Sequence, residues 1–135
     1  MRVLLDSSVL VAAHISRAGV CAELFEDVLM DHELVISEFI IDELARKLRE
    51  KFKFPEEEIA AVRSNLLADG VMVSPAEVPS TACRDPNDLP VLGTAAAGQV
   101  EVLITVDKDL LDLQKYSGIP IIRPGQFWRQ TEIDS

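Results

Sequence analysis

Short apolar runs alternate with helix-like segments along the whole chain, and this alternation is what most constrains its fold. The runs are continuously apolar, a pattern typical of strands that are buried on both faces. Such strands, when helices connect them, form a parallel sheet covered on both sides. Strands are expected at 2–5, 34–36, 71–73, 102–105 and 119–122, the last with Pro120 at a sheet edge. The sequence therefore predicts an α/β fold: a three-layer α/β/α sandwich around a parallel five-stranded sheet.

The segments between these runs carry apolar residues at helical spacing. Helices are expected at about 8–15 and 20–30, after Ser37 as N-cap, from Pro55 to just before Gly70, at about 86–97 and from Asp109. No linker, repeat or low-complexity tract interrupts the 135 residues, a common length for one domain. We therefore expect a single domain over residues 1–135.

Several kinds of site and location are disfavoured by the residues present. Cys21 and Cys83 are far apart, match no metal-binding spacing, and are expected to be free thiols. With His14 and His32 also isolated, a zinc site is not indicated, so any metal would be held by oxygen. The longest apolar runs, such as 9–13, are too short to span a membrane or serve as a signal peptide. The expected location is the cytoplasm.

Acidic residues follow the predicted strands, and their positions are the main functional signal. Ligands of an open parallel sheet bind beyond the carboxyl ends of its strands. Asp6 ends the first strand, and Thr105, Asp107 and Asp109 end the fourth. Glu43 lies about two turns into the helix after the second strand. Asp85 and Asp88 lie where a long loop enters the helix before the fourth strand. Separate segments should thus deliver carboxylates to one edge of the sheet.

A cluster of carboxylates is unfavourable by itself, because like charges repel and raise each other's pKa. A divalent cation removes this conflict, and Mg²⁺ and Mn²⁺ prefer carboxylate oxygens. Such an ion can lower the pKa of a bound water and stabilise charge on a phosphoryl oxygen. Hydrolysis of phosphodiester bonds is therefore the natural chemistry of the predicted cluster.

Each acid also has an ordinary structural interpretation. Asp6 and Asp107 could cap the helices that follow them, and so could Asp109. Glu43 could simply pair with Lys47 one turn later. Asp85 before a proline is typical of an ordinary turn, and Asp88 in a first helical turn interacts favourably with the helix dipole. The shared location of these acids, not any one of them, supports the interpretation as a site.

Four motifs in order resemble those of the PIN-domain ribonucleases. The first is Val3-Leu4-Leu5-Asp6-Ser7-Ser8-Val9-Leu10, and the second is Ser37 with Glu43 and Leu44. The third is Asp85-Pro86-Asn87-Asp88, followed by Leu92 and Ala95-Ala96-Ala97. The fourth is Leu103-Ile104-Thr105-Val106-Asp107-Lys108-Asp109-Leu110. The subgroup that the chain most resembles is the stand-alone, VapC-like toxins of toxin–antitoxin systems.

This resemblance implies a sheet order of 3-2-1-4-5, a Mg²⁺ or Mn²⁺ cofactor and RNA as substrate. It further implies an antitoxin protein as a possible partner, and a homodimer. The residues that match the family's catalytic quartet are Asp6, Glu43, Asp88 and Asp107. The resemblance makes Asp6, Asp88 and Asp107 the metal ligands, with Ser8, Thr105, Asp109 and Asp85 around them. In this interpretation Ser8 and Thr105 hydrogen-bond the carboxylates, whereas Asp85 and Asp109 have no assigned role.

The net charge of −10, from 23 acidic and 13 basic residues, argues against broad binding to nucleic acid. A local basic run, with Arg46, Lys47 and Arg49 followed by Lys51 and Lys53, could still hold RNA phosphates. It could equally be a solvated helix face opposite the acidic residues 56–58, or a partner surface.

Two rival functions stay open at this point. The first is a non-catalytic PIN fold that serves as a scaffold or is held by a partner. The second is a phosphotransfer protein with Asp6 as the acceptor. The phosphotransfer interpretation fits the positions of the acids poorly, because dehalogenase-like enzymes carry a second Asp where this chain has Ser8.

Overall fold

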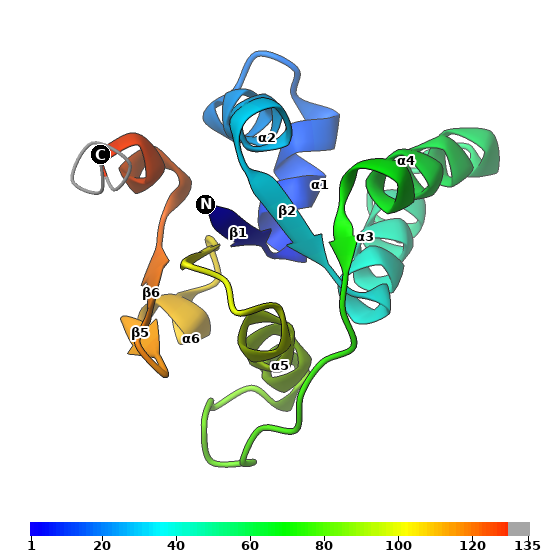
Figure 1. Cartoon of the computed structure of the whole chain (residues 1–135). Helices are drawn as coiled ribbons and strands as arrows, with labels where there is room; N and C mark the ends of the chain where they lie inside the picture. The colour runs from blue at the N-terminus through cyan, green and yellow to red at the C-terminus, as the bar shows by residue number, and fades with distance from the viewer. Residues whose placement is uncertain (130–135) are drawn as a thin grey trace.

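The computed structural model describes residues 1–129 of the chain, so the end of the predicted domain, residues 130–135, lies outside the described residues (Figure 1). Its centre is a six-stranded sheet in the order β3-β2-β1-β4-β6-β5. The strands are β1 (Arg2–Leu5), β2 (Glu33–Ile36), β3 (Val71–Met72), β4 (Val102–Ile104), β5 (Lys115–Tyr116) and β6 (Ile119–Ile122). All neighbouring pairs are parallel except β5 and β6. The predicted α/β fold and the order of its first four strands are confirmed.

The prediction of five strands was wrong, because a short hairpin adds a sixth at the edge. Ser117 and Gly118 both have positive φ, 51° and 80°, as a two-residue hairpin turn requires. This turn lays Lys115 antiparallel to Pro120. The strand predicted at 119–122 is β6, which lies between β4 and β5, so Pro120 is not on an edge strand.

The helices cover the sheet in layers. They are α1 (Ser7–Ile15), α2 (Val20–Asp31), α3 (Glu38–Glu50), α4 (Glu56–Asp69), α5 (Leu89–Gly98) and α6 (Lys108–Leu111), with a 3₁₀ turn η1 (Pro86–Asp88) before α5 and another, η2 (Pro124–Gln126), near the end. In Figure 1, α1 and α2 lie on one side of the sheet and α5 lies on the other. Helix α4 packs mainly against α3, so this pair extends from the rest of the molecule.

The two central strands carry the core. Every residue of Val3–Leu5 and Val102–Ile104 is fully buried, as continuous apolar strands between two helical layers require. Because β1 and β4 are adjacent and parallel, the residues that follow them emerge side by side at the same sheet edge. Among the described residues no single helix is long and apolar enough to cross a membrane. By length and composition alone, α1 and α2 taken together meet the criteria for a broken membrane span, with a bend of 107° between them.

Candidate active site

Asp6 and Thr105 lie next to each other where β1 and β4 end. The backbone N–H of Asp6 donates to the Ile104 carbonyl at 3.1 Å, which continues the pairing of the two strands by one residue. The Thr105 hydroxyl then donates to Asp6 Oδ2 at 2.5 Å. The chain therefore brings the ends of its first and fourth motifs into direct contact.

Asp6 is held on both of its carboxylate oxygens. Oδ1 caps α1, because it accepts from the backbone N–H groups of Ser8 at 3.1 Å and Val9 at 3.3 Å. The Ser8 hydroxyl also donates to Oδ1, at 2.5 Å. Burial raises the pKa of Asp6, while the hydrogen bonds from Ser8, Thr105 and Val9 and the charge of Lys47 oppose that rise. Asp6 is thus both a helix cap and a fixed acid, and the two interpretations of this residue are compatible.

Asp107 joins Asp6 through Thr105. Its backbone N–H donates to Thr105 Oγ1 at 2.9 Å, and its Oδ1 caps α6 by accepting from the N–H of Asp109 at 2.8 Å. The Asp107 side chain is half-buried, unlike the almost fully buried Asp6. The threonine hydroxyl therefore fixes the spacing between the two acids.

Asp88 is a second buried acid of the site with a raised pKa. Only 7% of its surface is exposed, and its pKa is raised to about 7. Burial is the largest cause, followed by the negative charge of Asp107 and a hydrogen bond to its side chain. The charges of Asp85 and Asp6 add smaller increases. Asp88 therefore experiences negative charge from three other acids, with no cation among the causes of its shift.

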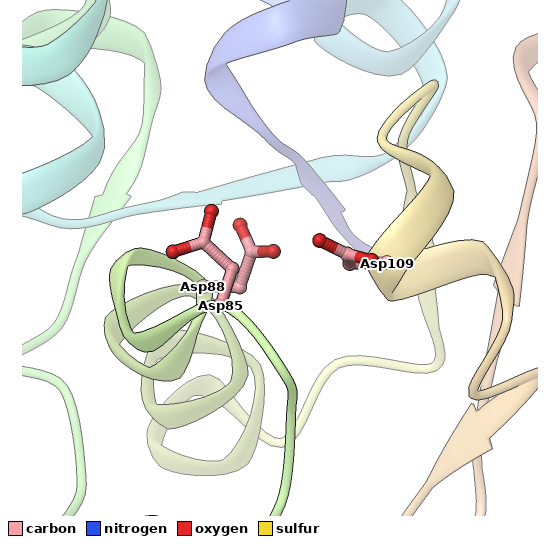
Figure 2. Close-up of side chains that lie close together, drawn as sticks. All are labelled: Asp85, Asp88 and Asp109. Carbon is pink, nitrogen blue, oxygen red and sulfur yellow. The ribbon is translucent and has the colours of Figure 1, made fainter.

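Asp85, Asp88 and Asp109 form a group of acids that lie close enough to share one metal ion. One carboxylate oxygen of each lies within 4.8 Å of the others. Figure 2 shows Asp85 and Asp88 projecting together from the start of the α5 region, with Asp109 directed at them from α6. Asp85 Oδ1 also caps η1 by accepting from the N–H of Asn87 at 3.0 Å. Asp85 and Asp109 thus lie directly beside Asp88.

Glu43 lies outside this group, but its environment connects it to Asp6. The Ser7 hydroxyl donates to Glu43 Oε1. Lys47 Nζ lies 3.4 Å from the same oxygen and donates to Ser7 Oγ at 3.0 Å. The ordinary pairing of Glu43 with Lys47 is therefore present. It forms beside Asp6, whose pKa the Lys47 charge lowers.

The basic run on α3 is divided among different partners. Arg49 makes two contacts with Glu56, at 2.5 and 3.0 Å, as the interpretation of a solvated face opposite residues 56–58 predicts. Arg46 pairs with Glu50 at 3.2 Å on the exposed side of the helix. Lys47 points the other way, into the site. Arg46 lines a hollow beside Glu43, whereas Arg49 is engaged elsewhere.

Three residues near the acids were not anticipated from the sequence. Ser7 follows a predicted cap and carried no separate signal. Cys83, a free thiol as predicted, packs its Sγ 3.9 Å from Asp88 Oδ2, and burial raises the pKa of its thiol. Asn87 lines the hollow next to Glu43. Its place in Asp85-Pro86-Asn87-Asp88 was the one signal that could have identified it.

The donor set fits a hard divalent cation. Carboxylate oxygens are the ligands that Mg²⁺ and Mn²⁺ prefer, and Asp88, Asp107 and Asp6 supply them from three elements of the fold. Burial, followed by the charges of the neighbouring acids, raises the pKa of Asp88, and Arg84 Nη2 lies 3.0 Å from Asp109 Oδ1 at the exposed side of the group. Among the described residues, no cysteine or histidine joins the acid group that lies close enough to share an ion.

Comparisons with known proteins identify the same architecture. A family model described as "PIN domain" matches residues 2–109. No curated protein matches the sequence. One similar solved structure is VapBC2 from Rickettsia felis bound to a DNA fragment from its promoter, with 14% identity and a TM-score of 0.63 over 91% of this chain and 98% of that one. A second is VapBC-1 from nontypeable Haemophilus influenzae, with 17% identity and a TM-score of 0.65 over 93% of this chain and 99% of that one. A third is PAE2754 from Pyrobaculum aerophilum, with 18% identity and a TM-score of 0.65 over 98% of this chain and 90% of that one. At these identities the structural likeness establishes the fold alone.

Proposed function

Since this chain belongs to the PIN domain family, we propose that it is a Mg²⁺- or Mn²⁺-dependent ribonuclease that hydrolyses phosphodiester bonds in RNA. The observation that carries the proposal is that Asp85, Asp88 and Asp109 bring carboxylate oxygens within 4.8 Å of one another, while burial and the charges of Asp107, Asp85 and Asp6 raise the pKa of Asp88. A protein that maintains such repulsion loses stability unless a cation enters the site. The acids' position beyond the carboxyl ends of β1 and β4 is where ligands of such sheets bind.

We propose that Asp88, Asp107 and Asp6 hold the metal. Of these three, only Asp88 belongs to the group of described acids that lie within 4.8 Å of one another, and its other members are Asp85 and Asp109. A bound divalent ion supplies a water of lowered pKa and a positive charge for the phosphoryl oxygens. Ser8 and Thr105 keep the Asp6 carboxylate in one orientation through their hydroxyls. Glu43, held by Ser7 and Lys47, faces the hollow beside the acids and is placed to orient a water.

We further propose that the chain is the toxin of a toxin–antitoxin pair, as its resemblance to VapC-like proteins implies. Two of the similar structures are described as VapBC assemblies, which supports a protein partner without identifying one. A homodimer stays a prediction that sedimentation of the purified chain would test.

The metal site is tested first by thermal unfolding with and without Mn²⁺. A ligand at 100 times its dissociation constant stabilises a folded protein by about 2.7 kcal/mol. We expect Mn²⁺ to raise the Tm of wild type and of the matched control Asp69→Asn, which alters an exposed acid on α4. The same ion should not raise the Tm of Asp88→Asn. Cleavage of a mixed-sequence single-stranded RNA should follow the same order.

Other outcomes favour the rival functions. A Mn²⁺-stabilised protein that cleaves no RNA but binds a partner would favour the scaffold. Acid-labile phosphate on Asp6 would favour phosphotransfer, although Asp6 is only 4% exposed and both its oxygens accept hydrogen bonds. Equal Mn²⁺ shifts for wild type and Asp88→Asn would contradict the proposed ligand set.

A further inference from the structure

Two hollows meet at Phe39, next to the acids. The first, of about 300 Å³, is lined by Phe39, Asp42, Glu43, Arg46 and Asn87. The second, of about 470 Å³, is lined by Phe39, Pro75, Ala76, Val78, Pro86, Leu89 and Pro90, and we call it the Phe39 hollow. Glu43 lines the first hollow, and Pro86, two residues before Asp88, lines the Phe39 hollow.

The two hollows differ in their chemistry. Of the residues that line them, Arg46 is the one cation, and it lies in the first hollow with Asn87 and two acids. The Phe39 hollow has no charged lining residue, and its rings are those of one phenylalanine and three prolines. A cation next to an uncharged, ring-lined hollow is the arrangement that accommodates the phosphate and the base of one nucleotide.

The outer wall of the Phe39 hollow is fixed in place. The backbone N–H of Ala76 donates to the Gly93 carbonyl at 3.0 Å, which ties the segment after β3 to α5. A Cβ on Gly93 would lie 2.4 Å from the Ala76 carbonyl oxygen, so this approach depends on the glycine. The hollow is thus formed before any ligand arrives, which lowers the entropic cost of binding.

The charges of the chain favour a base over a run of phosphates as the source of affinity. The net charge is −10, and the cations near the site are already paired: Arg49 with Glu56, Arg84 with Asp109 and Asp112, and Arg46 with Glu50. Of these, Arg46 lines the first hollow, where a phosphate would have to displace Glu50. Stacking of a base on an aromatic side chain contributes about 1–3 kcal/mol and needs no positive charge. Contact with an exposed base is therefore the more effective source of affinity for an acidic nuclease.

We propose that the Phe39 hollow is a subsite that binds one unpaired nucleobase of the RNA substrate. Phe39 supplies the stacking face, and Arg46 contacts the adjoining phosphate. Asn87 lines the first hollow beside Arg46, so its amide N–H can donate to the same phosphate. This inference rests on the proposed ribonuclease activity.

The test compares Phe39→Leu with Phe52→Leu, which replaces a 43% exposed phenylalanine just beyond the far end of α3, roughly 20 Å along the helix. Leucine keeps the apolar volume and removes the ring. The probe is a short, fluorescein-labelled single-stranded RNA of mixed sequence. Its binding is measured by anisotropy without divalent metal, and its cleavage is measured with Mn²⁺. Tm, with and without Mn²⁺, verifies folding and the metal site of each variant.

We expect Phe39→Leu to weaken RNA binding about tenfold and to leave the Mn²⁺-induced Tm shift unchanged. Phe52→Leu should match wild type. A duplex of the same sequence should compete poorly, because its bases are already stacked. Binding should also fall only gently with salt, with a log–log slope of about −1, as one or two phosphate contacts give.

The failures are distinguishable. If wild type binds and cleaves the RNA but Phe39→Leu does so equally well, the base site is overturned and the ribonuclease stands. The Phe39 hollow would then be a candidate docking site for a protein partner. If wild type binds Mn²⁺ yet neither binds nor cleaves RNA, both proposals fail together.

Discussion

Four of the acids in the candidate site have structural roles as well as proposed chemical ones. Asp6, Asp85 and Asp107 each cap the helix or turn that follows them, through one carboxylate oxygen. Glu43 pairs with Lys47. The ordinary interpretation of each residue and the interpretation as a site thus coexist, because a cap at the carboxyl end of a strand necessarily lies at the ligand-binding edge of the sheet.

The pKa of Asp88 predicts an unusual pH dependence of stability for the metal-free protein. The ordinary pKa is 3.8, and the folded value is about 7, so the folded state holds its proton more tightly. The contribution of Asp88 to the free energy of unfolding is fully present below about pH 4 and is lost as the pH rises to about 7. Asp88→Asn abolishes that loss. At pH 8 in EDTA we expect its Tm to exceed that of wild type by about 4 °C for each kcal/mol relieved.

Melting both proteins in EDTA at pH 5 and pH 8 checks this prediction. The Tm difference between wild type and Asp88→Asn should be small at pH 5 and larger at pH 8. If the Tm of wild type and the Tm of Asp88→Asn fall by the same amount between pH 5 and pH 8, the pKa shift assigned to Asp88 is not present.

At the residue scale, the position of each acid along the chain could be predicted, as could the partners Ser8, Thr105 and Lys47, but the contacts of Ser7 and Cys83 could not. Asp6, Asp88 and Asp107 were identified because each follows a strand or opens a helix, which the sequence reveals. The pairing of Lys47 with Glu43 was among the interpretations of the sequence, whereas the packing of α3 on α1 is what brings Lys47 to Ser7. Contacts between distant segments depend on such packing and have no local sequence signal.

At the scale of elements, helix and strand positions followed from the apolar pattern to within a few residues. The strand missed was β5, where the local signal was turn chemistry at Ser117-Gly118 and not hydrophobicity. A two-residue strand carries too few residues to show a period. The long segment after β3 was correctly left without regular structure, and its Pro75 and Ala76 form the wall of the Phe39 hollow.

Gly93 on α5 controls that wall, which Gly93→Ala should disturb. Its Cβ would meet the Ala76 carbonyl oxygen at 2.4 Å, so backbone must shift, and we expect a loss of about 1–3 kcal/mol in the free energy of unfolding. The matched control is Gly125→Ala, where a Cβ meets no atom within 4 Å. Urea denaturation of both variants measures the difference, and equal stability would show that the wall yields without cost.

At the scale of the whole molecule, the fold class was readable because continuous apolar strands admit few architectures. The single domain over 1–135 stays a prediction, as do the cytoplasmic location and the homodimer. The net charge of −10 initially opposed a nucleic-acid substrate. The proposed base site in the Phe39 hollow would reconcile the acidic net charge with an RNA substrate, because stacking of a base needs no positive charge.

The proposed toxin activity predicts an effect on living cells. Strong induction of the wild-type chain in a bacterial host, without an antitoxin, should arrest growth, and induction of Asp88→Asn should not. Growth curves after induction, with immunoblots to confirm equal protein levels, measure this. Normal growth with abundant wild-type protein would count against the toxin role while leaving the nuclease chemistry open to assay in vitro.

The way α4 is attached has a consequence for how the molecule opens. This helix packs mainly against α3, and of its own residues Ile59 and Leu66 are buried. The ion pairs that Arg63 makes with Glu38 and Asp42 are exposed and add little. Helix α4 can therefore unfold while the sheet and its acids persist. Its amide hydrogens should exchange with deuterium well before those of β1 and β4, and a protease should cut there first.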